Sequence, residues 1–159
     1  MSVPRHAQIL PSVLDRLLDD EPDQSHIESI SLFELSQFKR ALARDLEALL
    51  NTRLMPLDEL MESFPQACES LLTFGIPDLS GISLLNPDDR ELLREQLRRS
   101  IELHEPRLSR VRVNLDAPRE MERHLRFRVD AVLKVHPHRP PVTFDATLQL
   151  SSNVYKVQG

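Results

Sequence analysis

The spacing of apolar residues changes from helical to alternating near residue 106, and this change predicts two kinds of structure in succession. Before it, several segments repeat apolar residues every three or four positions, as amphipathic helices do. After it, apolar and polar residues alternate, which is typical of strands with one buried face. The sequence therefore predicts an α+β fold, with N-terminal helices packed on a C-terminal antiparallel β-meander, because the two apolar surfaces must cover each other.

The first long helix is predicted from about Leu32 to Asn51. Ser31 and Glu34 have the spacing of a capping box, in which each side chain accepts from a free N–H at the helix start. The expected apolar face has helical spacing and comprises Leu35, Phe38, Leu42, Leu46 and Leu49. A short second helix is predicted over 65–74, because a proline begins this segment and a glycine follows it.

A third helix is predicted to begin after Asn86, a favourable N-cap, and to end near His104, shortly before Pro106. On its exposed face, Glu95 and Arg99 are four residues apart and are expected to pair. Its expected buried face comprises Leu92, Leu93, Leu97 and Ile101.

Three alternating runs then predict three strands, at 111–115, 125–135 and 142–150. Short connections containing proline join them, as in an antiparallel meander. A last short strand is predicted at 154–157. We interpret it as an edge strand whose free N–H and C=O groups could add to the sheet of another protein.

Residues 1–30 are predicted to form a tail ahead of a single domain at 31–159. The tail contains a short amphipathic run within residues 6–18, and an acidic stretch with Pro22 follows it. The apolar residues of this run are Ile9, Leu10, Val13, Leu14, Leu17 and Leu18. Such a run is too short to form a stable helix alone. It is expected to dock either on its own domain or in the groove of a partner, and the sequence favours neither.

Charge is unevenly distributed along the chain, whose net charge is −5. Residues 1–89 are strongly acidic and residues 90–128 are basic, and nearly all the basic side chains are arginine. This pattern fits a solvated, ion-paired surface or a bipolar protein that lies between two partners. The single cysteine, Cys68, cannot form an internal disulfide, and no apolar run approaches the roughly 18 residues of a membrane helix, so we expect a cytoplasmic protein without membrane insertion.

A search for catalytic or ligand-binding patterns yields no convincing site. With three glycines in the chain, a phosphate-binding loop is excluded. His136 and His138 have no third metal ligand close in sequence, so a metal site is not expected. No motif selects two of the many acids for glycoside hydrolysis, and Cys68 is interpreted as a small buried apolar residue rather than a nucleophile.

Nucleic-acid binding is also not expected, because the arginines of the predicted strands lack aromatic side chains beside them. These arginines are Arg110, Arg112, Arg126 and Arg128. We therefore predict a protein without a catalytic set, metal, cofactor or nucleic-acid partner.

Five segments in order resemble the baseplate wedge proteins of contractile phages and their homologues in bacterial type VI secretion systems, the family to which TssE belongs. The most specific is Glu105-Pro106-Arg107-Leu108, which follows an amphipathic helix and precedes an alternating strand. The others are 12–17, 44–53, 70–79 and 141–145. In the segment 70–79, Phe74 stands where the family often has tyrosine.

The resemblance implies a structural subunit rather than an enzyme, although the family carries a historical lysozyme label. Such a subunit would join the wedge proteins TssF and TssG to the first ring of the contractile sheath, built from TssB and TssC, and help to start sheath assembly. It would belong to a six-fold assembly at the cytoplasmic side of the inner-membrane complex and be monomeric alone. The alternative is a regulatory protein-binding module on the same fold, like stress-response anti-adaptors.

Three segments are predicted to bind partners. Pro106 stops a helix and fixes the chain direction, so that Glu105 and Arg107 project from a rigid corner. Arg107 is expected to bind a carboxylate of a partner or a carboxylate of its own fold, and the sequence leaves both open. We also expect that removing residues 153–159 abolishes sheath docking and leaves a folded domain. The full set is Glu105, Pro106, Arg107, Val13, Leu14, Asp15, Arg16, Leu17, Val154, Tyr155, Lys156 and Val157.

Overall fold

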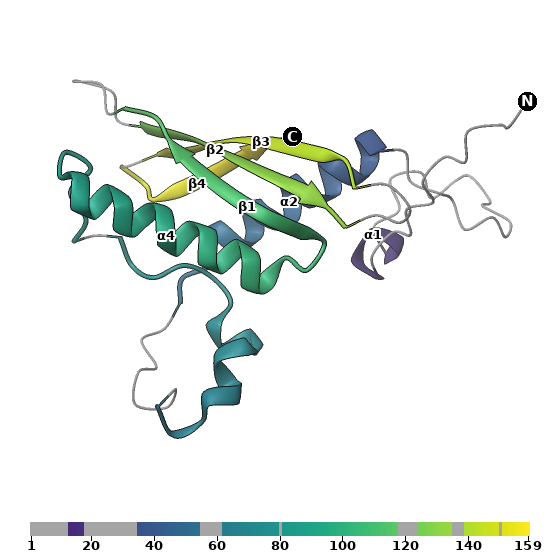
Figure 1. Ribbon diagram of the computed structural model, residues 1–159, viewed down its shortest axis with the longest axis horizontal. Coiled ribbons are helices and arrows are strands. Elements are labelled where there is room, and N and C mark those ends of the chain that lie inside the picture. The colour runs from purple at the N-terminus through teal and green to yellow at the C-terminus, as the bar shows by residue number, and fades with distance from the viewer. Residues whose placement is uncertain are drawn as a thin grey trace, which may run out of the picture.

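The computed structural model describes residues 13–17, 35–54, 62–79, 81–117, 124–134, 139–149 and 151–159 (Figure 1). Helices precede strands, so the predicted α+β order is confirmed. The helices are α1 (Val13–Leu17), α2 (Leu35–Asn51), the 3₁₀ helices η1 (Pro65–Glu69) and η2 (Leu71–Thr73), and α4 (Pro87–His104). The strands are β1 (Leu108–Leu115), β2 (His124–Leu133), β3 (Pro141–Gln149) and β4 (Val154–Gln158).

The four strands form one antiparallel sheet in the order β1-β2-β3-β4, which is the predicted meander. The register joins residues of one face across the sheet, for example Val129 between Val113 and Phe144. The β1–β2 register shifts between Ser109 and Arg112, and Arg110 there has φ 54, as in a β-bulge. This irregularity lies at the start of β1, directly after the corner that joins it to α4.

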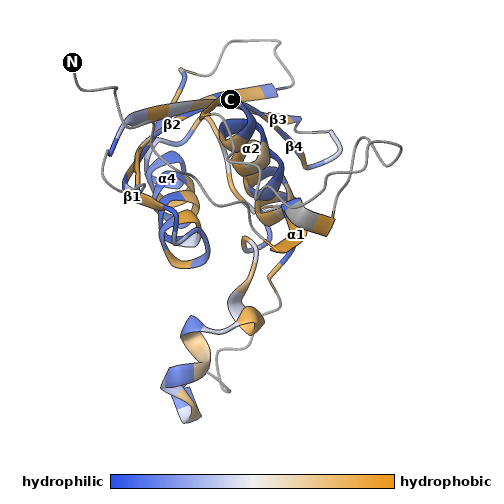
Figure 2. Ribbon diagram, turned by 90° about the vertical axis from the view of Figure 1, so that its right-hand side faces the viewer, coloured by the Kyte–Doolittle hydropathy of each residue, from blue (hydrophilic) through white to orange (hydrophobic). Residues whose placement is uncertain are grey.

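Helices α2 and α4 lie side by side on one face of the sheet and share one core with it (Figure 2). Burial follows the alternation of the strands and the helical spacing of both helices, as predicted. Two expected core residues, Leu35 and Leu92, are instead exposed. Leu35 is the first residue of α2. Leu92 is turned about 100° from its neighbour Leu93, which belongs to the buried stripe. The buried residues of the two helices are Phe38, Ala41, Leu42, Ala43, Leu46, Leu49, Leu50, Leu93, Leu97, Ser100 and Ile101.

The segment predicted as one short helix over 65–74 is instead two 3₁₀ helices. Ser70 separates them in an extended conformation, with φ −100 and ψ 177, and its hydroxyl accepts from the N–H of Leu72. Neither 3₁₀ helix buries a side chain, so no apolar contact favours a continuous α-helix. Gly75 then turns the chain with φ +119, where an added Cβ would lie 2.5 Å from the carbonyl oxygen of Thr52.

The N-terminus of α4 is capped as predicted, because the side chain of Asn86 accepts from the N–H of Asp88. The expected pair of Glu95 with Arg99 is replaced: Arg98 pairs with Glu95 and with Glu102. These partners lie three and four residues away, which are both favourable separations on a helix surface.

Some predictions fall on residues that lie outside the described part of the chain. They concern the capping box of Ser31 and Glu34, the pair of His136 and His138, and the outer ends of the second and third predicted strands. Among the described residues, no group of three His, Cys, Asp or Glu side chains is placed to hold a metal ion. No described helix has the length and apolar character needed to cross a membrane.

Candidate functional site

The corner between α4 and β1 is fixed by hydrogen bonds on both sides of Pro106. The N–H of Glu105 donates to the carbonyl of Ile101 at 2.9 Å, which continues the helical pattern to the end of α4. The carbonyl of Glu105 then accepts from Leu108, and the carbonyl of Arg107 accepts from Lys134. The chain therefore changes from helix to strand within three residues, with its polar backbone groups paired.

Glu105 and Arg107 form an internal ion pair at this corner. One carboxylate oxygen of Glu105 accepts from the backbone N–H of Arg107 at 3.1 Å and from its Nε at 2.6 Å. The other oxygen accepts from the guanidinium Nη2 at 2.5 Å. The side chain of Glu105 is only 6% exposed, so this forked pair is largely removed from water. Of the two alternatives left open by the sequence, the structure shows the internal pair.

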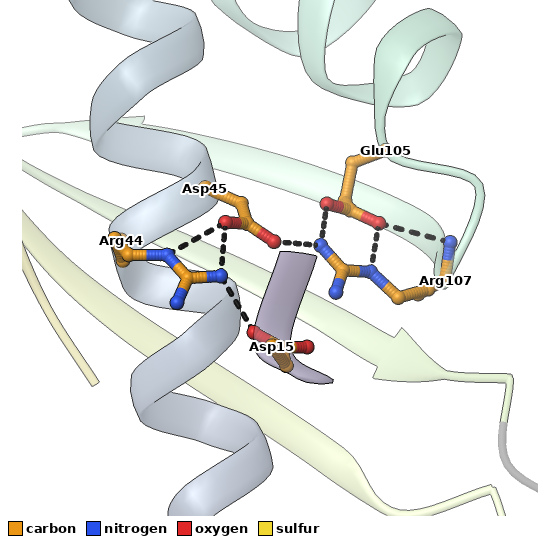
Figure 3. A network of polar contacts seen from close by, with 5 residues as sticks. All are labelled: Asp15, Arg44, Asp45, Glu105 and Arg107. Carbon is orange, nitrogen blue, oxygen red and sulfur yellow. Dashed lines mark hydrogen bonds and ion pairs between the residues drawn. The ribbon is translucent and has the colours of Figure 1, made fainter. Parts of the chain in front are cut away.

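The same guanidinium extends the pairing to α2. Nη2 of Arg107 donates to Asp45 at 2.6 Å, and the other oxygen of Asp45 accepts from Nε and Nη2 of Arg44. Arg44 in turn donates to Asp15 of α1 at 2.6 Å. Figure 3 shows the resulting chain of alternating charges, which we call the ion-pair network: Asp15, Arg44, Asp45, Arg107 and Glu105.

The electrostatics of the ion-pair network favour its charged form. Burial lowers the pKa of Arg107, but hydrogen bonds to Glu105 and Asp45 outweigh this cost and the pKa is raised. The pKa of Arg44 is raised for the same reason, since Asp15 and Asp45 outweigh its partial burial. The stem of Arg107 also brings its guanidinium 5.8 Å from the ring centroid of Phe38, within reach of a cation–π contact.

Sequence reasoning identified Glu105, Arg107 and Asp15 as site residues but missed Arg44 and Asp45. Arg44 is not part of the predicted apolar face of the first helix, and no feature of its spacing indicates a partner 29 residues away. The sequence contains one weak signal for them, because Arg44 and Asp45 are the first two residues of the family-like segment 44–53. The network joins three parts of the chain that only the fold brings together.

Helix α1 is attached to the domain through Asp15, whose side chain is 2% exposed. The apolar residues Val13, Leu14 and Leu17 are exposed around it. The N-terminal run therefore docks on its own domain by a polar contact, and its apolar side chains remain available to another molecule. The side chain of Arg16 lies outside the described part of the chain.

Strand β4 lies at one edge of the sheet, but its outer groups are not free as predicted. The side chain of Asn51 accepts from the N–H of Tyr155 and donates to its carbonyl, both at 2.9 Å. Glu47 accepts from the N–H of Val157, and Arg53 donates to the carbonyl of Asn153. Side chains at the end of α2 thus cover this edge, which protects it against strand addition.

The side chains of β4 differ in accessibility. Tyr155 is completely buried, and its ring meets that of Phe127 edge-on at 6.0 Å between centroids. It is therefore a core residue, and removing residues 153–159 would remove part of the core, contrary to the expectation of an intact domain. Val154 and Lys156 are exposed, and Val157 is half-buried.

The ion-pair network can cross-link α1, α2 and the corner between α4 and β1, and so hold the surfaces of these elements in place. The five residues of the ion-pair network include no serine, cysteine or histidine, and each of its carboxylates accepts from a guanidinium. On the opposite, polar face of the sheet, Arg128 pairs with Asp145, whereas Arg112 and Arg126 are exposed.

The chain is similar to known baseplate proteins. The family described as "Baseplate wedge protein gp25" matches residues 36–138, which is more than half of the chain. A chain in a solved structure titled "The baseplate complex from the type VI secretion system" is 19% identical, with a TM-score of 0.46. That similarity covers 69% of this chain and 92% of the other. No curated protein sequence matches.

Proposed function

Because the chain belongs to the baseplate wedge protein gp25 family, we propose that it is a non-enzymatic structural subunit of the baseplate of a type VI secretion system. In this role it links the wedge proteins TssF and TssG to the sheath proteins TssB and TssC and helps to start sheath assembly. The baseplate would lie at the cytoplasmic side of the inner membrane.

The observation that carries this proposal is the ion-pair network. It ties α1, α2 and the corner between α4 and β1 into one unit, through charged hydrogen bonds that are partly or largely shielded from water. An adaptor that holds two partners in a fixed geometry needs such cross-links, because an unlinked N-terminal segment would leave its own binding surface without a defined position.

Two surfaces support an adaptor rather than a catalyst. The exposed apolar residues of α1, Val13, Leu14 and Leu17, are held in place by Asp15 and suit a groove in a partner. Pro106 is also exposed, at the corner that the ion-pair network links to α1. We propose that α1 and this corner bind one partner together.

Co-purification with TssF and TssG tests the proposal. We expect the wild-type chain to form a stable complex and Leu17→Ser to weaken it, since Leu17 is 75% exposed and its loss should leave the domain folded. Leu85→Ser is the matched control, because Leu85 is 80% exposed and lies away from α1.

Charge reversal of Arg107 is a poor test, since a carboxylate placed between Glu105 and Asp45 would disrupt the domain itself. A folded wild-type chain that binds neither TssF and TssG nor TssB and TssC would refute the adaptor role. That result would shift support to the regulatory alternative.

A further inference from the structure

A small arm projects from the domain on the side of α4 away from the sheet. It consists of residues 62–73, which include η1 and η2, and except at its base, Thr73, it stands apart from the sheet and from both long helices (Figures 1 and 2). None of the residues of η1 or η2 is buried. The arm therefore adds little to the core of this domain.

Large apolar side chains are exposed on the arm. Leu71 is 83% exposed, and Phe64 and Leu72 are also more exposed than buried. A soluble protein gains nothing by holding three such groups in water on one projecting segment, and exposed apolar clusters of this kind mark binding surfaces. The arm is thus a second exposed apolar surface of the described chain, besides that of α1.

The base of the arm is firmly attached. The backbone carbonyl of Thr73 lies 2.7 Å from Nε2 of His104, and Phe74 meets the His104 ring edge-on at 5.3 Å. Ser100 donates to the carbonyl of Gly75 at 2.7 Å. His104 directly precedes Glu105 of the ion-pair network, so the arm is presented in a fixed orientation relative to that network.

The charge of the arm indicates the chemistry of its partner. Residues 54–89 contain seven acidic residues and no lysine, arginine or histidine. On the arm, Glu62 and Glu69 are exposed and form no ion pair with any residue that the structure describes. These carboxylates therefore remain available to basic side chains of a partner. The acidic residues are Asp58, Glu59, Glu62, Glu69, Asp78, Asp88 and Asp89.

We propose that the arm docks in an apolar groove of another baseplate or sheath protein, and that arginine or lysine side chains line the rim of this groove. Phe64, Leu71 and Leu72 fill the groove, while Glu62 and Glu69 meet the basic rim. The inference rests on the proposed function, because it assigns one surface of the adaptor to one partner.

Binding of the full-length chain to purified TssF–TssG, and separately to TssB–TssC, tests this inference. The double variant Leu71→Ser/Leu72→Ser should raise the Kd for one of the two roughly tenfold or more, as loss of central apolar contacts does. Leu85→Ser is the control, since it replaces one leucine off the arm whose exposure of 80% is close to the 83% of Leu71. Both variants should show the thermal unfolding of wild type, because the substituted side chains are exposed.

A second variant tests the charge of the groove. Glu62→Gln/Glu69→Gln should weaken the same complex and reduce the salt dependence of its Kd, because two attractive pairs are removed. An unchanged Kd and an unchanged salt dependence would contradict the proposal that basic side chains line the rim of the groove.

Four further outcomes are decisive. Arm variants that bind both preparations like wild type, or a control that weakens binding equally, overturn the docking role while leaving the adaptor role in place. Self-association of the isolated chain that disappears in Leu71→Ser/Leu72→Ser identifies a second copy as the occupant and also overturns the inference. A wild-type chain that binds neither preparation refutes the proposed function and with it the arm's role.

Discussion

Replacing Arg107 with methionine removes the central cation of the ion-pair network while keeping an unbranched side chain over Phe38. Glu105 loses two of the three hydrogen bonds that its carboxylate accepts and keeps only the bond from the backbone N–H. Asp45 loses one donor and keeps Arg44. The variant therefore leaves a nearly buried carboxylate without a counter-ion.

The expected cost follows from this burial. Removing one partner of a buried ion pair costs about 3–5 kcal/mol, because the remaining charge is left without compensation. The guanidinium side of the pair is 25% exposed, which allows some water to replace the lost donors. We therefore expect Arg107→Met to lower the free energy of unfolding by about 3 kcal/mol, at the lower end of that range.

Urea unfolding followed by circular dichroism at neutral pH measures this change through the transition midpoint. Arg98→Met is the matched control, since Arg98 also contacts two carboxylates but lies in an exposed network on α4. It should cost less than about 1 kcal/mol. Glu105→Gln combined with Arg107→Met completes a double-mutant cycle, and the double variant should be more stable than Arg107→Met alone, because no unpaired charge remains.

Two results would contradict a stabilising role of the buried Glu105–Arg107 pair. One is equal destabilisation of the domain by Arg107→Met and Arg98→Met, and the other is a cycle without coupling between Glu105 and Arg107. Either result would mean that the corner is held by its backbone alone. A stable Arg107→Met variant that no longer binds TssF and TssG would then assign Arg107 to the partner contact that the sequence left open.

Three other substitutions test separate features. Gly75→Ala should cost about 2–3 kcal/mol, because its φ of +119 is unfavourable with a Cβ and the added carbon meets the carbonyl of Thr52. Gly81→Ala, with open space around it, should cost far less in the same urea assay. Tyr155→Phe should stabilise the domain by about 1 kcal/mol, since the buried phenol oxygen has no hydrogen-bond partner among the described residues. Burial raises the pKa of Tyr155 above its ordinary value of 10.0, so the unfolded chain loses this proton first and stability should fall above about pH 10, by up to about 1.4 kcal/mol per pH unit. Urea transitions across this pH range should show the fall in wild type, and Tyr155→Phe should lack this contribution. Asn51→Ala should cost about 2 kcal/mol by removing both bonds to the Tyr155 backbone, and it should increase light scattering by uncovering the β4 edge.

The elements with strong periodicity could be predicted from the sequence. The strands and both long helices were placed correctly because apolar spacing reports directly which side of an element is buried. The prediction of one short helix over 65–74 was wrong. A proline and a glycine indicate where a short helix can begin and end, but they do not indicate its hydrogen-bond pattern. Leu92 was misplaced because four apolar residues near one stripe do not show which of them lies outside it.

The polar contacts could be predicted only in part. Glu105 and Arg107 are two residues apart, so their pairing was among the alternatives considered. Asp45 is 62 residues from Arg107 in sequence, and only the packing of α2 beside the corner brings them together. The pairing of Asn51 with the backbone of Tyr155 at the β4 edge could not be predicted either, because these residues are 104 positions apart and only the fold brings them together.

The link between α2 and β4 also determines the order in which the chain can complete its fold during synthesis. Glu47 and Asn51 leave the peptidyl-transferase centre 110 and 104 residues before their partners Val157 and Tyr155. At about 5–20 residues per second, that separation corresponds to roughly 5–20 s. Hairpins such as β1–β2 form in microseconds, so the sheet can assemble as it emerges. The apolar face of α2 must wait several seconds for β4, and in this interval the part of that face that β4 will cover is exposed to other chains.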